Sequence, residues 1–332
     1  MNKTFITLAA AMLMLCGGQS YATSWRINND NTKGTQFADI NAAMSSEEVV
    51  DGDTLYIDPG STIASDQNVT KRVVIIGSGY NPYDRPYGSA VISGNLYLQA
   101  EGSKVMGMEL NGAVYIAANN ITVERCKCTN AIGRSGSSYT DATIRQCYIS
   151  KGISGDGKTS TKSASWTIEN NIIVGVTYDN KCIYSLYNAT ISNNLLINPV
   201  SYNGYCLREL ATCTVKNNII IHTTTADQTL SSLSECTLSH NIISQEWGDN
   251  NLVATTVAEV LTGDYERYTL VENSPAAGYG DDGNDCGIFG GSFPYVAGGL
   301  PLGHPYFTKA VIGSNVSDGV VNVSLQIKVQ DE

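Results

Sequence analysis

Between residues 121 and 243, apolar and polar side chains alternate in short runs that return at a regular interval. A threonine followed by an apolar residue recurs at Thr122, Thr143, Thr167, Thr190, Thr214 and Thr237. Each unit continues into a second apolar run, such as Ile172-Ile173. Alternation with a period of two is typical of β-strands, and a repeat of about 23 residues is too short for helical repeats. The pattern predicts a strand, a tight bend and a second strand in every unit.

The alternation also predicts which side chains face inward. Two apolar columns should line a core: Ile121, Ala142, Trp166, Ala189, Cys213 and Cys236, and then Val123, Ile144, Ile168, Ile191, Val215 and Leu238. The threonines and a further column should face outward; that column is Glu124, Arg145, Glu169, Ser192, Lys216 and Ser239. Its first three charges alternate in sign, as expected for a solvated ladder.

One position at the bend repeats almost unchanged, as Cys126, Cys147, Asn171, Asn194, Asn218 and Asn241. Asparagine tolerates the left-handed conformation of a tight bend, and its amide can bond to an identical amide one repeat away. Identical side chains at one position are useful if the chain coils and stacks each turn about 4.8 Å from the last. We therefore predict an all-β solenoid.

These repeats resemble the right-handed parallel β-helix of the pectate-lyase-like superfamily of secreted bacterial proteins, including its asparagine ladder. Residues 37–43 look like the amphipathic helix that caps the first coil, residues 52–57 and 73–77 like opening rungs, and residues 274–276 with 285–291 like a closing segment. The resemblance implies one β-helix with caps over residues 23–296. This superfamily includes lyases, hydrolases, adhesins and non-catalytic proteins, so the resemblance predicts a fold more narrowly than an activity.

Residues 297–332 differ in composition from the repeats. A glycine-rich linker, Ala297–Pro301, precedes Val311-Ile312 and the alternating run Val320–Val329, which together predict two strands. We expect a small β appendage that pairs with the last rung and covers its open edge. An attachment element for a surface partner is the alternative.

The amino terminus has the pattern of a secretory signal. Lys3 precedes the apolar run Phe5–Leu15, and the small residues Ser20 and Ala22 predict cleavage after Ala22. A lipoprotein signal at Cys16 is the less favoured alternative, because bulky Leu15 stands where such signals need a small residue. No later stretch approaches the ~18 apolar residues of a membrane helix. We expect a secreted, periplasmic or cell-surface protein with no membrane span.

The net charge bears on which classes of partner are expected, and the cysteine spacing bears on disulfides and metal sites. The chain has 332 residues, 20 Lys and Arg against 31 Asp and Glu, and a net charge of −11, which argues against nucleic acid as a partner. Eight cysteines would remain after signal removal, a number that suggests disulfides. However, several occupy equivalent positions of neighbouring repeats, where side chains point the same way, so stacked free thiols are favoured. No cysteine spacing is typical of a zinc site.

Two clusters are candidates for binding. Seven basic residues form a local strip that could hold the carboxylates or sulfates of an acidic polysaccharide: Arg125, Lys127, Arg134, Arg145, Lys151, Lys158 and Lys162. Five tyrosines fall in two consecutive repeats beside Lys181, Arg208 and Glu209: Tyr178, Tyr184, Tyr187, Tyr202 and Tyr205. Flat rings with polar rims suit sugar faces. The alternatives are chance clustering of charge and ordinary strand tyrosines.

The sequence is compatible with two strand registers for the coils that carry the tyrosine cluster. Tyr184 and Arg208 lie one period apart, as do Lys181 and Tyr205. Either the column Cys182, Cys206, Leu230 or the column Ile183, Leu207, Ser231 should face inward.

The resemblance also suggests roles in chemistry. Uronate lyases of this superfamily use a Lys or Arg base, often with Ca²⁺, which makes Lys181 and Arg208 the catalytic candidates; the candidate substrate contacts are Tyr184, Tyr187, Tyr205, Glu209, Lys158 and Arg134. The motifs of its polygalacturonase-type hydrolases are absent. The acidic loop Asp281–Asp285 could bind Ca²⁺ through its oxygen atoms, although a capping turn is simpler.

The sequence favours a surface or secreted β-helix protein that recognises a glycan, an acidic polysaccharide above others. The first alternative is a polysaccharide lyase that cleaves uronate-containing glycans by β-elimination. The second is a purely structural or adhesive surface protein.

Overall fold

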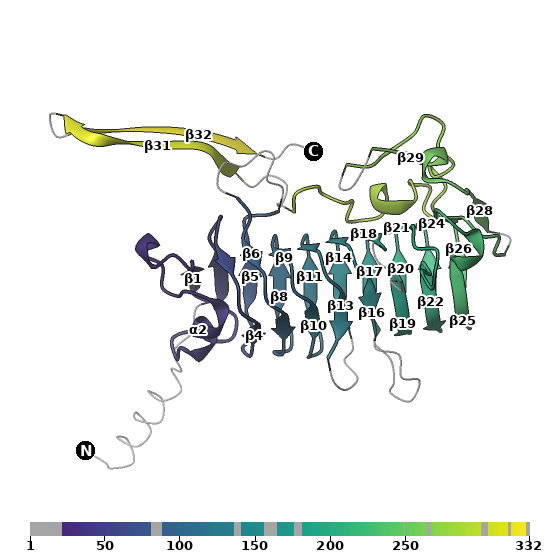
Figure 1. Cartoon of the computed structure of the whole chain (residues 1–332), viewed down its shortest axis with the longest axis horizontal. Helices are drawn as coiled ribbons and strands as arrows, with labels where there is room; N and C mark the ends of the chain where they lie inside the picture. The colour runs from purple at the N-terminus through teal and green to yellow at the C-terminus, as the bar shows by residue number, and fades with distance from the viewer. Residues whose placement is uncertain are drawn as a thin grey trace, which may run out of the picture.

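The computed structural model of the chain describes residues 22–80, 88–135, 141–155, 165–175, 181–248, 250–263, 267–299, 305–317 and 320–329. The architecture is the predicted right-handed parallel β-helix, in which three parallel sheets run the length of the coils (Figure 1). Each full coil gives one short strand to each sheet. The prediction of two strands in each repeat therefore missed one strand. This third strand lies in the more variable half of the repeat.

The strands of the three sheets follow one another in coil order. Sheet A contains β1 (Ser24–Ile27), β2 (Thr54–Ile57), β5 (Val74–Ile76), β8 (Lys104–Met106), β11 (Thr122–Glu124), β14 (Thr143–Arg145), β17 (Thr167–Glu169), β20 (Thr190–Ser192), β23 (Thr214–Lys216) and β26 (Thr237–Ser239). Sheet B contains β3 (Thr62–Ile63), β6 (Val91–Ile92), β9 (Glu109–Leu110), β12 (Lys127–Cys128), β15 (Tyr148–Ile149), β18 (Ile172–Val174), β21 (Leu195–Asn198), β24 (Ile219–His222), β27 (Asn241–Ile243) and β28 (Asn251–Val253). Sheet C contains β4 (Gln67–Val69), β7 (Leu96–Leu98), β10 (Val114–Ile116), β13 (Ile132–Arg134), β16 (Ile153–Ser154), β19 (Ile183–Tyr187), β22 (Leu207–Ala211) and β25 (Leu230–Ser234).

Short helical segments and two hairpins complete the described elements. They are η1 (Asn31–Lys33), α2 (Ile40–Ser45), η3 (Ala226–Gln228), η4 (Val257–Glu259), η5 (Gly287–Phe289), the pair β29 (Leu261–Thr262) and β30 (Thr269–Leu270), and the pair β31 (Pro305–Ser317) and β32 (Val320–Val329). No helix among the described residues is long and apolar enough to cross a membrane.

The predicted capping helix is present as α2, and it starts slightly later than expected, at Ile40. The Asp39 side chain caps it by accepting the backbone N–H of Ala42 at 2.7 Å. Ile40 and Ala43 are fully buried on its inner face, and the Asn41 backbone N–H donates to Gln67 at 3.1 Å. The helix therefore covers the first coil, where an open end of the core would otherwise meet water.

Both predicted inward columns line the core. Their members are nearly all fully buried, and Trp166 is the largest side chain among them. Only the last coil departs, because Cys236 and Leu238 are half-buried there. The threonine column faces outward as predicted. The expectation of a solvated charge ladder is wrong, since Glu124 is 5% exposed and lies under basic neighbours.

The asparagine ladder is confirmed, and it extends one step further, to Asn251. At each step from Asn171 onward, the side-chain oxygen of one asparagine accepts the backbone N–H and the side-chain amide of the asparagine one coil earlier, at 2.8–3.0 Å. The ladder ends at two thiols. The Cys147 backbone N–H donates to Asn171 at 2.9 Å, whereas the Cys126 backbone N–H has only the Cys147 sulfur, at 3.4 Å.

The expectation that the ladder residue itself adopts the left-handed conformation is wrong. The residue just before it does so in every coil, with φ between 52° and 57°: Arg125, Gln146, Asn170, Asn193, Asn217 and His240. One left-handed residue turns the chain sharply from sheet A to sheet B, which lets the following side chain point into the core. A second column of side chains is thereby presented outward at the bend.

This outward column holds the closing segment, residues 274–299, which we call the strap. Figure 1 shows the strap in yellow-green, running back along the coils toward the amino-terminal end. The Gly287 backbone N–H donates to the Asn217 carbonyl at 2.7 Å, Asn170 Nδ2 donates to the Gly290 carbonyl at 2.8 Å, and Gln146 Nε2 donates to the Pro294 carbonyl at 2.5 Å. The strap ends beside an early coil, where the Tyr80 backbone N–H donates to the Gly298 carbonyl at 2.9 Å.

The C-terminal appendage contains the two predicted strands, but the expectation that it pairs with the last rung is wrong. β31 and β32 form a two-stranded antiparallel sheet of their own. The strap explains the difference, because it carries the chain away from the last coil before the hairpin begins. The eight described cysteines are free thiols, and all but Cys236 are buried.

Candidate functional site

The outer surface of sheet C presents one continuous column of side chains. On most of its strands the central residue points outward between buried neighbours, as in Leu96-Tyr97-Leu98. The parallel register aligns these central residues across seven strands in the order Tyr97, Tyr115, Gly133, Ser154, Tyr184, Arg208 and Ser231. The candidate site is this column with the side chains beside it, which we call the sheet C face.

Two stacked tyrosines form the amino-terminal part of the sheet C face. The rings of Tyr97 and Tyr115 lie 4.7 Å apart between centroids, with 13° between their planes. The repeat found in the sequence does not reveal this pair, because the coils that carry it precede the repeat and are shorter. The signal that could have found it is the alternation of both tyrosines with buried aliphatic residues on each side.

The carboxyl-terminal part mixes aromatic and charged groups. Lys181 Nζ lies 5.6 Å from the Tyr184 ring centroid, and the Arg208 guanidinium lies 5.1 Å from that of Tyr205. Arg208 Nε also pairs with Glu209 at 3.1 Å. The structure thus brings together five of the predicted site residues and confirms that Tyr184 and Arg208 are direct neighbours on adjacent strands.

Glu209 is oriented by a second contact and by its backbone. The Ser185 hydroxyl donates to Glu209 Oε2 at 3.0 Å, and Glu209 adopts a left-handed conformation with φ of 54°. A non-glycine residue in this region is uncommon. The same conformation recurs at Ser185 and Ser232 in the neighbouring coils, so it reflects a bend within these strands.

Between the two aromatic parts, the sheet C face has only small side chains in its central positions. Gly133 and Ser154 occupy the central positions there, and a Cβ added to Gly133 would meet only the Ser154 carbonyl oxygen, at 3.9 Å. Tyr115 and Tyr184 are three strand spacings apart along this column, or about 14 Å. The result is a floor of small side chains between two flat aromatic platforms.

The remaining predicted site residues do not join the column. Arg134 aligns with the inward residue Ile116 and is only 9% exposed. Tyr187 is half-buried further along β19, opposite Ala211. Lys158 lies outside the described residues.

Of the two columns predicted as alternatives for these coils, both contribute inward-facing residues. Cys182 and Ile183 are both fully buried, as are Cys206 and Leu207, so both predicted columns turn inward there. In the next coil Leu207 pairs with Leu230 and Arg208 with Ser231, because that coil is slightly shorter than the one before it.

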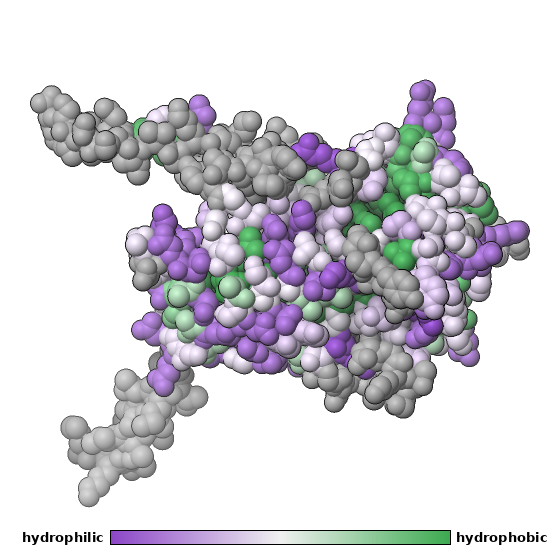
Figure 2. All heavy atoms as spheres, in the orientation of Figure 1, coloured by the Kyte–Doolittle hydropathy of each residue, from purple (hydrophilic) through white to green (hydrophobic). Residues whose placement is uncertain are grey.

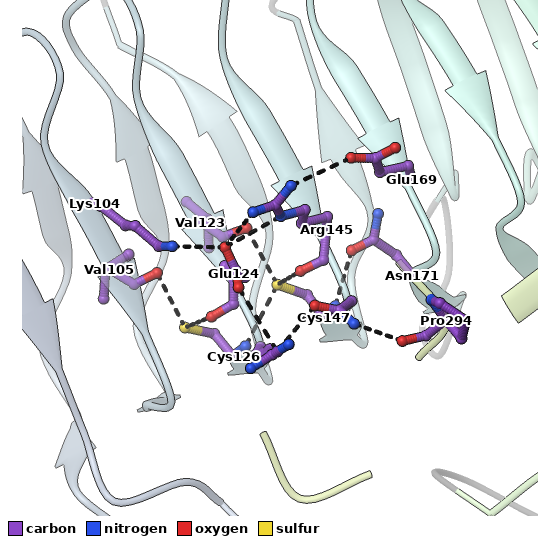
Figure 3. A network of polar contacts seen from close by, with 12 residues as sticks. Lys104, Val105, Val123, Glu124, Cys126, Arg145, Cys147, Glu169, Asn171 and Pro294 are labelled. Carbon is purple, nitrogen blue, oxygen red and sulfur yellow. Dashed lines mark hydrogen bonds and ion pairs between the residues drawn. The ribbon is translucent and has the colours of Figure 1, made fainter. Parts of the chain in front are cut away.

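A second charged cluster lies on sheet A and is shown in Figure 3. The Glu124 carboxylate contacts Lys104 Nζ at 2.8 Å and Arg145 at 2.9 Å. Burial raises the pKa of Glu124, but hydrogen bonds from the two cations outweigh it and the pKa is lowered. Glu169, 3.8 Å from Arg145, is different: its burial dominates and raises its pKa.

The sheet A cluster also meets the strap. The Phe293 ring lies 4.0 Å from the Arg145 guanidinium, and Arg125 Nε donates to the Gln146 side chain at 2.9 Å. Arg125 and Arg145 are two members of the predicted basic strip. They neutralise Glu124 and support the strap, so they do not contribute to an open cationic surface. The cluster ties neighbouring coils to the strap.

The acidic loop is engaged in turn contacts. Asp281 pairs with Lys216 at 2.7 Å and accepts the Asn217 amide at 2.6 Å, while Asp282 accepts the Asn284 backbone N–H at 3.0 Å. These contacts are those of a turn near the start of the strap. Within the described part of the chain, no group of three or more His, Cys, Asp or Glu side chains is arranged to hold a metal ion.

The comparisons with known proteins concern the fold alone. Neither a family model nor a curated protein matches the sequence. Among solved structures, the chain is similar to a GH136 lacto-N-biosidase from Eubacterium ramulus, with 10% identity and a TM-score of 0.46 for the native protein and 0.44 for its selenomethionine derivative. The aligned part covers 71% and 72% of this chain, and 57% and 58% of the biosidase. The chain thus spans a little over half the length of that enzyme.

Proposed function

We propose that the sheet C face binds a glycan chain laid across the strands. The observation that carries the proposal is the single outward column in which two tyrosine platforms flank a floor of small residues. Aromatic rings offer flat apolar surfaces with polar edges, a combination that matches the faces and hydroxyls of sugar rings. A column that crosses several strands suits an extended polymer better than a compact ligand.

The charges favour an acidic glycan at the carboxyl-terminal end of the face. Lys181 and Arg208 both lie against tyrosine rings there, so a sugar stacked on those rings would bring its carboxylate or sulfate near a cation. Glu209 offsets part of this charge, because it pairs with Arg208.

Binding is the function that the aromatic side chains of this face favour. Hydrolysis of glycosidic bonds generally needs two carboxyl groups on either side of the bond. The described strands of sheet C contain a single carboxylate, Glu209. A lyase needs only one base beside the sugar, and Lys181 and Arg208 are the candidates for such a base. Cleavage by β-elimination is therefore the second candidate function.

The proposal includes a location outside the cytoplasm. Residues 1–22 have the pattern of a cleaved secretory signal, and a glycan partner of this kind would be met at or beyond the cell surface. Cell fractionation with N-terminal sequencing of the purified protein tests this part directly, since the proposal expects Thr23 as the first residue.

The test is a binding titration against a panel of neutral and acidic polysaccharides, with Tyr115→Ala and Tyr184→Ala as variants. Loss of one platform should weaken binding by about tenfold, since about 1.4 kcal/mol corresponds to a factor of ten. Tyr56→Ala is the matched control, because Tyr56 is 43% exposed on sheet A, away from the face. Added salt should weaken binding of the acidic members only.

The same samples separate the two candidate functions. Ultraviolet absorbance of the unsaturated product, followed with and without Ca²⁺, would rise if the protein is a lyase, and Lys181→Ala should then abolish the signal. Binding without that rise supports recognition alone. Equal loss of affinity in Tyr56→Ala and Tyr115→Ala would show that the sheet C face is not the site.

A further inference from the structure

The C-terminal hairpin carries two apolar side chains, Val323 and Leu325, that its own chain leaves exposed. Every second residue of β32 is apolar from Val321 to Val329. Within this run, Val323 is 53% exposed and Leu325 is 52% exposed. Strict alternation of this kind is typical of a strand that buries one face. An isolated two-stranded hairpin is at best marginally stable in water, so the hairpin has the properties of an element that packs against a partner.

In the described structure, the last coil of the solenoid has unpaired strand edges and exposed apolar side chains. β25, β26 and β28 are the final strands of sheets C, A and B, so each has one edge without a neighbouring strand in the described structure. Leu252 and Val253 on β28 are 38% and 53% exposed, and Figure 2 shows apolar residues gathered at this end of the solenoid. Open strand edges with apolar side chains readily accept further strands.

The two surfaces lie at opposite ends of one molecule. The strap is anchored at Tyr80 in an early coil, and Figure 1 shows the hairpin projecting from there past the amino-terminal coils. The last coil lies at the other end of the solenoid. The hairpin of a chain is therefore far from its own open edge but is well placed to meet the open edge of another copy.

The charges of the two surfaces are also complementary. Residues 217–263 contain no Lys or Arg and five acidic residues: Asp227, Glu235, Glu246, Asp249 and Glu259. The hairpin, residues 305–329, contains Lys309 and Lys328 against a single acidic residue, Asp318, which gives it a net charge of +1. Opposite charges on two docking surfaces favour encounter and set the orientation of binding.

We propose that this hairpin docks on the last coil of a second copy of the chain, so that copies associate head to tail. The hairpin would extend the open sheets of its neighbour and cover its exposed apolar side chains. Because the two contact surfaces differ and lie at opposite ends, the contact does not close on itself and can repeat along a row of copies. This inference is independent of the glycan proposal.

Two variants and one control test the proposal on the whole chain after signal removal. V323K with L325K places charge on the apolar face of the hairpin, and L252D with V253D does the same on the last coil while keeping it acidic. S324K with Q326K is the matched control, because it adds the same charge to the opposite face of β32. Far-UV circular dichroism checks that each variant is folded.

Mass is then measured by light scattering and sedimentation over a concentration series. The proposal expects species larger than dimers in the wild type and in the control, growing with concentration and weakened by salt. Each double variant alone should remain monomeric, and an equal mixture of the two should stop at dimers, because only one intact surface of each kind remains. A monomeric wild type, or association that survives either double variant, would overturn the proposal.

Discussion

Replacing Asn194 by alanine should destabilise the solenoid strongly, because this side chain serves three coils at once. Its amide donates to the carbonyls of Ile168 at 2.8 Å and Ser192 at 3.0 Å and to the Asn218 side chain at 3.0 Å. Its oxygen accepts two N–H groups of Asn171 at 3.0 Å. The residue is fully buried, so water cannot easily replace these partners.

The magnitude follows from these contacts. The buried backbone N–H of Asn171 would lose its hydrogen-bond partner, at a cost of about 1–3 kcal/mol, and the other lost bonds contribute about 1 kcal/mol each. Together these five bonds give about 5–7 kcal/mol, which is comparable with the total stability of many domains. Domains of about 150–250 residues shift by about 2–4 °C per kcal/mol, and this chain is longer, so at about 2 °C per kcal/mol the unfolding temperature should fall by about 10–14 °C.

Urea unfolding followed by circular dichroism measures this loss, with Asn251→Ala as the matched control. Asn251 occupies the last step of the same ladder and makes similar hydrogen bonds, to Asn241 and to the Trp247 carbonyl, but it is half-buried. Water can reach the groups left behind there, so the expected loss is about 1–2 kcal/mol. Equal losses in the two variants would refute the argument that burial makes the ladder important.

Three further predictions concern other parts of the fold. Cys147→Asn should stabilise the protein by about 1 kcal/mol, because an amide oxygen is a better acceptor than sulfur for the Cys126 backbone N–H; a lower unfolding midpoint would contradict this. Glu124→Gln should cost about 3 kcal/mol in urea unfolding, since Lys104 and Arg145 lose their buried counter-charge, and Glu169→Gln should cost clearly less. Burial lowers the pKa of His222 from 6.5, so the unfolded chain binds more protons and stability should fall as the pH drops below about 6.5. His222→Gln should flatten that decline, and an unchanged pH profile would argue against the assignment.

The fold could be predicted because the same packing requirement recurs in every coil. Alternation fixes the inward columns, and a buried amide such as that of Asn194 is stable only when an identical one lies above and below it. The third strand of each coil was missed because its sequence follows no common pattern. Its loops differ in length, so the equivalent residues Ile132, Ile153 and Ile183 are 21 and then 30 residues apart and do not recur at a constant interval.

The candidate site could be predicted only in part. The neighbours Tyr184 and Arg208 were found, because the coil that separates them has the length of the main repeat. Tyr97 and Tyr115 were missed, since shorter coils shift them out of that repeat. The strap contacts of Gln146 and Arg145 could not be foreseen either, because they join residues far apart in the sequence and depend on the path of the chain after it leaves the last coil.

The strap has a consequence for how this protein can change in evolution. It meets the solenoid at three separate coils, contacting Asn217 through Gly287, Asn170 through Gly290 and Gln146 through Pro294. A solenoid can in general gain or lose a whole coil, because each coil contacts only its neighbours. Here a duplicated or deleted coil would shift every later contact of the strap out of register. The number of coils can therefore change only if the strap changes length at the same time.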